Sequence, residues 1–228
     1  VLTRSLLNEL EKQRVGVSLP SLRVDAFSVE LAKEIQKVRK TGLTFAPEAG
    51  TQRLRDVINK GVTEEDLERS ITGVFQAGWD AVKLYFIIGL PTETDEDIKG
   101  IAELAQKVML WGKEIKKARG GGKPLKITVS ISSFVPKPHT PFQWEPQDRL
   151  QTLQEKQQQL KRLLSGKKIT LNYHQSETSF LEAVFSRGDR RLGKVLKTAW
   201  EKGCRFDSWH EHFKYDAWLE SFKECEID

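Results

Sequence analysis

The side chains best suited to chemistry follow a short apolar run at residues 43–46. Glu48 and Thr51 lie in the polar turn of the segment APEAGT, and Lys60 follows the helical stretch after it. The turn presents Glu48 and Thr51 at the end of a strand, and the long flexible cation of Lys60 could reach back to an anionic ligand there. In parallel α/β folds, ligands bind at the carboxyl ends of strands, where such turns gather. The alternative is a helix cap at Thr51 beside two solvated charges.

Two later stretches repeat this pattern of an apolar strand followed by a turn. The run at 82–88 ends with Ile88 and continues into the Gly-x-Pro turn at Gly89. A second run at 127–134 leads to Val135 and a proline-rich loop, because proline prevents the strand from running directly into a helix. The pattern of an apolar strand followed by a turn therefore occurs three times along the chain.

The elements that position these turns alternate regularly between strand and helix. Strands are predicted at 15–19, with 22–24 continuing the same edge after Pro20, and at 43–46, 82–88 and 127–134. Helices are predicted at 2–13, 29–40, 63–76, 95–117 and from Thr51. Strand 82–88 is expected to be apolar on both faces, as in parallel sheets covered by helices on both sides. Such alternation predicts the α/β class, with parallel strands joined by right-handed crossovers. A long helix at 147–165, a short strand at 168–173 and further helices around an aromatic cap are expected after it.

Five ordered motifs resemble those of the radical S-adenosylmethionine (SAM) superfamily. They are SLRVD at 21–25, APEAGTQRLRDVINKG at 46–61, LYFIIGLPTETDEDI at 84–98, FVPKPHTPFQW at 134–144, and FLEAVFSRGDRRLG at 180–193 with FDSWHEHF at 206–213. The chain is similar to the Elongator-type and methylthiotransferase-like branch, and most of all to bacterial radical SAM proteins with an upstream cobalamin-binding-type domain. The resemblance implies a partial TIM-like (β/α) barrel. Residues 1–146 would hold about the last four of its six strand-helix units, and 147–228 a mostly helical extension with an aromatic cap.

The resemblance also implies roles for individual residues. Glu48 is assigned to the ribose or methionyl amine of SAM, Thr51 and Lys60 to its carboxylate end. Further assignments are Ile88 with Gly89 to the adenine face, Val135 to the base, and Arg23, Asp25 and His139, weakly, to the substrate chamber. Glu93 departs from the family's Gly-x-x-Glu spacing, so we expect it to cap the following helix. Many relatives have arginine in place of Lys60, which changes the bonding geometry but not the charge.

The cysteine-rich loop of the family is absent from this sequence. Its two cysteines, Cys204 and Cys225, cannot form Cys-x-x-x-Cys-x-x-Cys, and a [4Fe-4S] cluster needs thiolate ligands. The resemblance implies that these ligands lie in an upstream segment of the same protein, as would any cobalamin site. The first residue is Val1 and the only methionine is Met109, so we expect a piece of a longer chain. Alone it should be unable to generate a 5′-deoxyadenosyl radical from SAM.

Composition favours a globular protein of the cytoplasm. Of 228 residues, 38% are hydrophobic and 30% charged, with a mean hydropathy of −0.49. No apolar run approaches membrane-spanning length, and no signal peptide is visible, so no membrane partner is expected. Two cysteines give no disulfide framework, which suits a reducing compartment.

Two alternatives remain open from the residues. The basic run 113–126 would suit a non-catalytic RNA-binding or docking module, or a tRNA-modifying radical SAM enzyme, although such a run is more often a solvated loop. Cys204, His210, His212 and Cys225 have thiols and imidazoles that could bind zinc. The two histidines are two residues apart and point in different directions, which favours packing in the aromatic cap and no metal site. The substrate is not identified by any motif.

Overall fold

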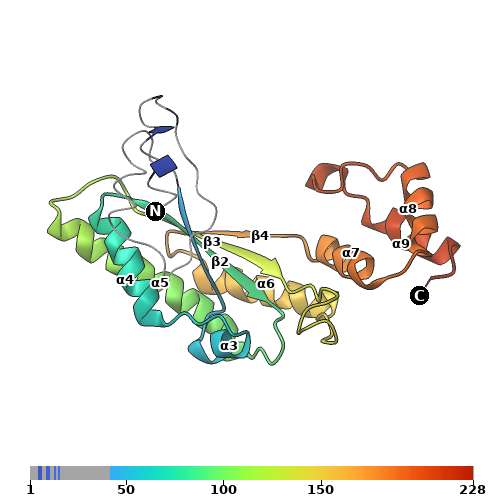
Figure 1. The fold of residues 1–228 in the computed structure, drawn as a ribbon, viewed down its shortest axis with the longest axis horizontal. Coiled ribbons are helices and arrows are strands. Elements are labelled where there is room, and N and C mark those ends of the chain that lie inside the picture. The colour runs from blue at the N-terminus through green and yellow to red at the C-terminus, as the bar shows by residue number, and fades with distance from the viewer. Residues whose placement is uncertain (1–4, 7–8, 11–12, 14, 16–41, 228) are drawn as a thin grey trace. The chain divides into compact units, whose positions relative to one another are not determined.

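The computed structural model describes residues 5–6, 9–10, 13, 15 and 42–227 (Figure 1). The predicted helix at 29–40 lies outside the described residues, and so does the strand at 15–19 apart from Val15, together with its continuation at 22–24. Arg23 and Asp25, the two weak candidates for the substrate chamber, also lie outside them.

Four parallel strands form one sheet in the order β1-β2-β3-β4. The strands are β1 (Leu43–Glu48), β2 (Ala81–Ile88), β3 (Lys126–Ser133) and β4 (Ile169–Tyr173). In the ladder Leu43 lies opposite Val82, and the register shifts between Phe45 and Glu48. The predicted α/β class is confirmed, and the sheet is consistent with a partial TIM-like β/α fold. The short strand predicted at 168–173 is confirmed as β4.

Helices follow the strands at the predicted places. They are α3 (Gln52–Val57), α4 (Glu64–Gln76), α5 (Asp95–Ala118), α6 (Leu150–Leu164), α7 (Ser176–Arg187), α8 (Leu192–Glu201), the 3-10 turn η2 (His210–His212) and α9 (Tyr215–Glu224). The three expected starts are confirmed, because Thr51, Thr63 and Thr94 are the N-cap residues of α3, α4 and α5. At the last two, an aspartate three residues on completes a capping box.

The sheet buries one face and leaves the other partly exposed. In β2 the side chains of Val82, Leu84 and Phe86 are buried in the core, and Lys83 and Tyr85 alternate with them at partly exposed positions. The expectation that β2 is apolar on both faces is therefore wrong. Successive side chains of a strand point to opposite faces, so the ammonium group of Lys83 and the phenol group of Tyr85 lie on the same face. That face cannot be buried as an apolar core.

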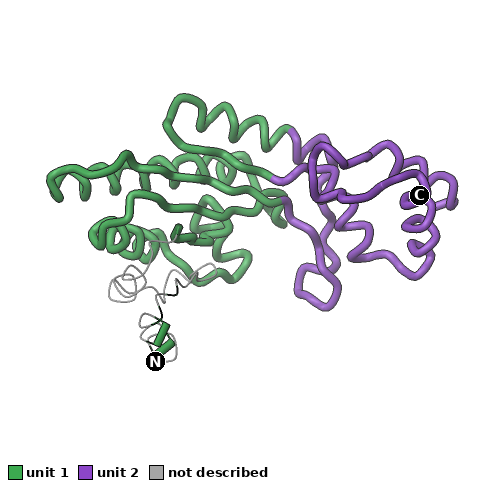
Figure 2. Tube along the Cα trace, turned by 90° about the horizontal axis from the view of Figure 1, so that it is seen from above, with its two compact units in different colours: residues 1–132, 155–173 green, residues 133–154, 174–228 purple. Residues whose placement is uncertain are grey.

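Contacts within the chain divide it into two compact units, coloured separately in Figure 2. Unit 1 comprises residues 1–132 and 155–173, and unit 2 comprises residues 133–154 and 174–228. The sheet lies in unit 1 except for the last residue of β3. The predicted domain boundary between residues 146 and 147 remains a prediction.

Unit 2 is built on helices with an aromatic core. Its buried core residues are Leu181, Leu192, Val195, Ala199, Cys204, Trp218 and Phe222. The rings of Phe185 and Trp218 meet edge to face with centroids 5.5 Å apart, a favoured arrangement. Trp209, in the motif FDSWHEHF, is not part of this core and is 59% exposed. None of the described helices combines the length and apolar character that crossing a bilayer requires.

Candidate functional site

The turn after β1 passes tightly over helix α5. Glu48, the last residue of β1, has a φ of 68°, in the left-handed region. A Cβ on Gly50 would lie 2.3 Å from the backbone nitrogen of Ile101 and 2.4 Å from the carbonyl oxygen of Asp97. Only glycine permits so close an approach of two backbones. Backbone packing therefore fixes this turn against α5.

Asp97, in the first turn of α5, accepts hydrogen bonds from several segments of unit 1. Its Oδ1 accepts from the hydroxyl of Thr51, and its Oδ2 pairs with the guanidinium of Arg53. Oδ2 also accepts from the backbone N–H and hydroxyl of Thr94, at 2.8 and 2.9 Å. Burial acts to raise the pKa of Asp97, but the hydrogen bonds from these donors outweigh burial and lower it. Asp97 is therefore a buried carboxylate that orients the turn.

Arg53 joins the turn after β1 to the turn after β2. Its Nη2 donates to the carbonyl oxygen of Thr92 at 2.9 Å while the same group pairs with Asp97. Thr92 has a φ of 64° in the turn that follows β2. Two of the three turns that follow the predicted apolar strands are thus held together within unit 1.

Arg55 is a buried organiser of the same turn, with only 1% of its surface exposed. Its Nε donates to the carbonyl oxygen of Val62 at 3.1 Å, and its Nη1 to those of Ala49 at 3.1 Å and Gly50 at 3.4 Å. Nη2 donates to Oε1 of Gln52 at 3.1 Å. Burial lowers the pKa of Arg55, an effect that nearby carboxylates oppose. One side chain thus satisfies carbonyls before and after α3.

Glu48 and Lys60 form an ion pair at the carboxyl end of β1. The distance from Nζ of Lys60 to Oε1 of Glu48 is 3.0 Å, and the side chains are 30% and 24% exposed, Lys60 first. Lys60 follows α3, and its side chain contacts the strand end at Glu48; its predicted contact to an anionic ligand stays a prediction. Asn59 and Gly61, on either side, have φ values of 53° and 61°, which turn the chain here. The pair is accessible enough to exchange its mutual contact for contacts to a ligand.

The turn after β2 is closed by Glu93. Oε2 of Glu93 accepts from the backbone N–H of Gly89 at 2.8 Å and from Nζ of Lys156 at 2.7 Å. The Glu93 side chain is 1% exposed, and that of Lys156 is 16% exposed. The expectation that Glu93 caps α5 is wrong, because Thr94 and Asp97 form that cap. Glu93 instead holds Gly89, whose φ is 79°, at the end of the strand.

The other predicted site residues occupy different settings. The hydroxyl of Thr51 donates a hydrogen bond to Oδ1 of Asp97. The same hydroxyl oxygen accepts a hydrogen bond from the backbone N–H of Leu54 at 3.3 Å. Ile88 is fully buried, so its side chain belongs to the core of unit 1. Val135 and His139 lie in unit 2. The backbone N–H of His139 donates to Oε1 of Gln143 at 3.2 Å, and its side chain is exposed.

The sequence pattern missed the residues that fix the site: Arg53, Arg55, Asp97 and Lys156. A signal existed for Asp97, since it stands three residues after Thr94 at the position of a capping-box acid. Nothing in the sequence indicates that the same carboxylate also binds Thr51 and Arg53, because those partners lie more than 40 residues away.

The cysteines of this chain do not fit an iron-sulfur cluster. Cys204 is buried in the core of unit 2, where burial raises the pKa of its thiol. The sulfur of Cys225 lies 3.6 Å from the hydroxyl of Thr198. Over the described ranges, no three or more His, Cys, Asp or Glu side chains gather as metal ligands would. The two thiols of this chain therefore serve packing.

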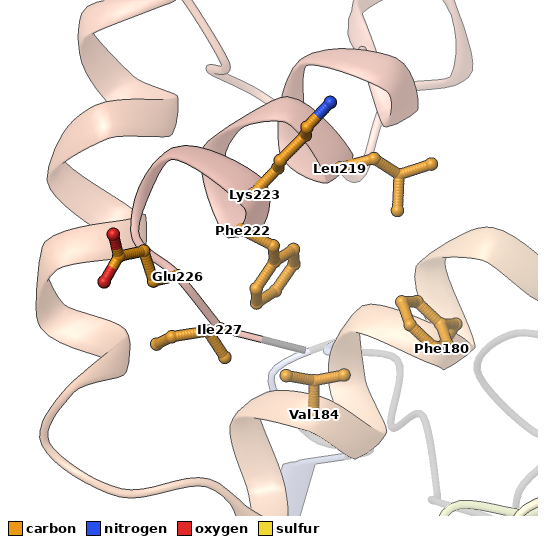
Figure 3. Close-up of a pocket in the computed structure, with 7 residues that line it drawn as sticks. All are labelled: Phe180, Val184, Leu219, Phe222, Lys223, Glu226 and Ile227. Carbon is orange, nitrogen blue, oxygen red and sulfur yellow. The ribbon is translucent and has the colours of Figure 1, made fainter.

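Unit 2 contains an apolar cavity of about 310 Å³ between α7 and α9 (Figure 3). In this view Phe180, Val184 and Phe222 converge from the two helices, and the charged ends of Lys223 and Glu226 point away from them. Five of the seven lining residues are apolar, and Lys223 and Glu226 are the charged residues among them. The chemistry-bearing side chains gather instead in unit 1.

Comparison with known proteins places these residues in context. Residues 1–105 match the family model of the radical SAM superfamily, which covers β1, β2 and both of their turns. The chain is also 36% identical, over 191 residues, to an uncharacterized protein of Methanocaldococcus jannaschii. That match covers 84% of this chain and 39% of the relative. The chain therefore spans about two fifths of the length of the curated relative it matches.

Proposed function

Because residues 1–105 match the family model of the radical SAM superfamily, we propose that this chain is part of an iron-sulfur, SAM-dependent radical enzyme that abstracts hydrogen from its substrate. When bound, SAM and a [4Fe-4S] cluster supply the radical chemistry, and the protein supplies binding and orientation. The cluster ligands lie outside this chain in the proposed enzyme, since its two cysteines are committed to unit 2. The Elongator and methylthiotransferase branch, and any cobalamin site, are parts of this proposal that rest on resemblance.

The observation that carries the proposal is the accessible ion pair between Glu48 and Lys60 on a rigid turn. A SAM molecule carries both an ammonium and a carboxylate on its methionyl end. Glu48 would accept from the ammonium or a ribose hydroxyl, and Lys60 would bind the carboxylate. The turn is held by Gly50, Arg55 and Asp97, so little ordering is left to occur on binding.

The remaining predicted contacts are proposed in a narrower form. Gly89 has no side chain, so adenine would approach the backbone of Ile88 and Gly89, while the Ile88 side chain stays in the core. Thr51 would position the turn through Asp97, because its hydroxyl hydrogen is already donated there. Val135 would contact the base, and His139 the substrate. These assignments remain proposals.

The basic run 113–126 supports an RNA-binding or docking module less well. Two of its cations bind backbone carbonyls of the same unit: Nζ of Lys116 donates to Lys123 and Nη1 of Arg119 to Phe75, both at 2.7 Å. Gly121 and Gly122 have φ values of 110° and 144°, which mark a turn. The run therefore closes the connection between α5 and β3, although its exposed lysines could still meet phosphates of RNA.

The test is SAM binding by calorimetry to the full-length protein, with its cluster reconstituted anaerobically. We expect Glu48→Ala and Lys60→Ala each to weaken SAM binding about tenfold or more, the effect of losing one charge-assisted hydrogen bond. Glu96→Ala and Lys99→Ala serve as matched controls, because they remove a more exposed ion pair on α5. Absence of SAM binding by the cluster-loaded protein would sink the proposal.

A further inference from the structure

One face of the sheet in unit 1 carries polar side chains on all four strands, among the apolar residues Ala46, Ala81 and Ile87. The side chains at its alternate positions include Thr44 in β1, Lys83 and Tyr85 in β2, Thr128, Ser130 and Ser132 in β3, and Thr170 and Asn172 in β4. The ladder places Thr44 opposite Lys83 and Thr128 opposite Thr170. A polar row across a sheet needs hydrogen-bonding partners, which water or a ligand can provide.

A cavity of about 200 Å³ lies at the amino-terminal end of this face. It is bordered by the residues Thr44, Lys83, Lys126 and Thr128 together with small or apolar strand residues. Within residues 42–227, no carboxylate forms an ion pair with either lysine. The nearest acid along the chain is Asp80, whose Oδ1 lies 3.5 Å from where a Cβ on Gly122 would stand, toward the turn before β3.

Lys83 is held in place rather than extended into solvent. Its Nζ donates to the phenol oxygen of Tyr85 at 2.9 Å and lies 4.6 Å from the centre of that ring. The ammonium has two further hydrogens, and the phenol can donate its own hydrogen onward. The pair therefore presents several donors from one fixed point on the sheet.

We propose that Lys83 and Lys126, with the hydroxyls of Thr44 and Thr128, form a binding site for the phosphate group of a ligand. Two ammonium groups match the charge of a phosphate monoester, which is about −1.5 to −2 at neutral pH, better than that of one carboxylate. Hydroxyl donors on both neighbouring strands suit the several acceptor oxygens of phosphate. The cavity offers more than ten times the ~10–15 Å³ that one ordered water requires.

The site lies at the opposite end of the strands from Glu48 and Gly89. Glu48 lies four positions after Thr44, and strands rise about 3.3 Å per residue, so the phosphate would bind roughly 13 Å from the proposed SAM turn. This step rests on the proposed function: the substrate class it names is an elongated phosphate ester, anchored at one end and reacting at the other. The anion site itself does not depend on SAM chemistry.

The test measures binding of inorganic pyrophosphate by calorimetry and phosphorus NMR in the full-length protein at physiological salt. Lys83→Met and Lys126→Met should each weaken pyrophosphate binding about tenfold or more, through loss of one charge-assisted contact. Lys99→Met, which removes the same charge from exposed α5, should leave binding unchanged. Thr44→Val with Thr128→Val gives a second route if a lysine variant does not fold, and should also weaken binding.

Several outcomes would overturn the phosphate site. They are no binding of pyrophosphate, equal weakening in Lys99→Met, or succinate binding as tightly as pyrophosphate. SAM titrations on the same samples separate this site from the proposed function. If pyrophosphate binds and SAM does not, the phosphate site is supported and the proposed SAM function is overturned. If SAM binds and pyrophosphate does not, the proposed SAM function is supported and the phosphate site is overturned.

Discussion

The two units stabilise their structures with different kinds of buried group. Unit 1 buries Arg55 and Asp97 and holds them by hydrogen bonds to two turns. In the described part of unit 2, every buried polar residue is a serine, and the core is made of rings, aliphatic chains and Cys204. Hydrogen bonds are directional and apolar packing is not. The buried groups of unit 1 must therefore place particular donor and acceptor atoms, whereas those of unit 2 must mainly fill the available volume.

This difference explains why candidate chemistry concentrates in unit 1. A ligand with several polar groups needs donors and acceptors at fixed positions, which a turn locked by buried charges provides. The cavity of unit 2 is larger than the cavity beside Lys83, about 310 against 200 Å³, yet five of its seven lining residues are apolar. Size alone is therefore a poor guide to the site in this molecule.

The largest expected effect comes from conservative replacement of Arg55. Arg55→Lys keeps the charge but cannot reach three carbonyls and the side chain of Gln52 together, so we expect a loss of about 3–5 kcal/mol in the free energy of unfolding. Urea unfolding followed by circular dichroism measures it. Arg69→Lys, at a side chain 73% exposed, is the matched control and should change stability by less than ~0.5 kcal/mol.

The matching replacement in unit 2 should be tolerated. Phe222 is 9% exposed and packs in the aromatic core, so Phe222→Ala should cost about 3 kcal/mol, but Phe222→Leu only about 1.5 kcal/mol or less. Leu219→Ala, on the same helix and 42% exposed, controls for local helix effects. Should Phe222→Leu cost as much as Arg55→Lys in the same urea titration, the contrast between the units would be wrong.

Gly50, in the turn after β1, tests whether backbone packing also holds the polar site of unit 1 in place. Gly50→Ala forces a methyl group against α5, and we expect a loss of about 1–3 kcal/mol together with weaker SAM binding, because the turn must move. Gly42→Ala is the matched control, since nothing lies within 4 Å of its added Cβ. Unchanged stability and SAM affinity in Gly50→Ala would show that the turn is not fixed by this contact.

The same contrast separates what could be predicted from the sequence from what could not. The caps at Thr51, Thr63 and Thr94 were predictable, because a cap depends on residues within one helical turn. The strands at 82–88 and 127–134 were predictable from their apolar runs. The burial of Arg55 was not, since arginine is usually exposed and its partners here are backbone carbonyls that the sequence does not distinguish. The run at 82–88 predicts a strand that is apolar on both faces, because most of its residues are apolar. Lys83 and Tyr85 nevertheless make one of those faces polar.

The smallest effect is the pH dependence of stability, which should differ in sign between the units. The folded pKa of Asp97 is lowered, so its contribution is present above the unfolded pKa of about 3.9 and lost as pH falls toward the folded value. Burial raises the folded pKa of Cys204, so its contribution is present below the unfolded value of about 8.5 and lost as pH rises through the folded one. Burial also raises the pKa of Tyr215, which leaves some alkaline sensitivity in any cysteine variant.

Urea midpoints at pH 3, 7 and 10 test this assignment. Asp97→Asn should flatten the decrease in stability between pH 7 and 3 and leave the alkaline decrease intact, although the variant is less stable throughout. Cys204→Ala should reduce the decrease between pH 7 and 10 without changing the acid side. If either variant altered both sides equally, the titrating groups would not be confined to their own units. The buried carboxylate and the buried thiol would then be coupled through the fold, and the division into a polar unit and an apolar unit would no longer describe its energetics.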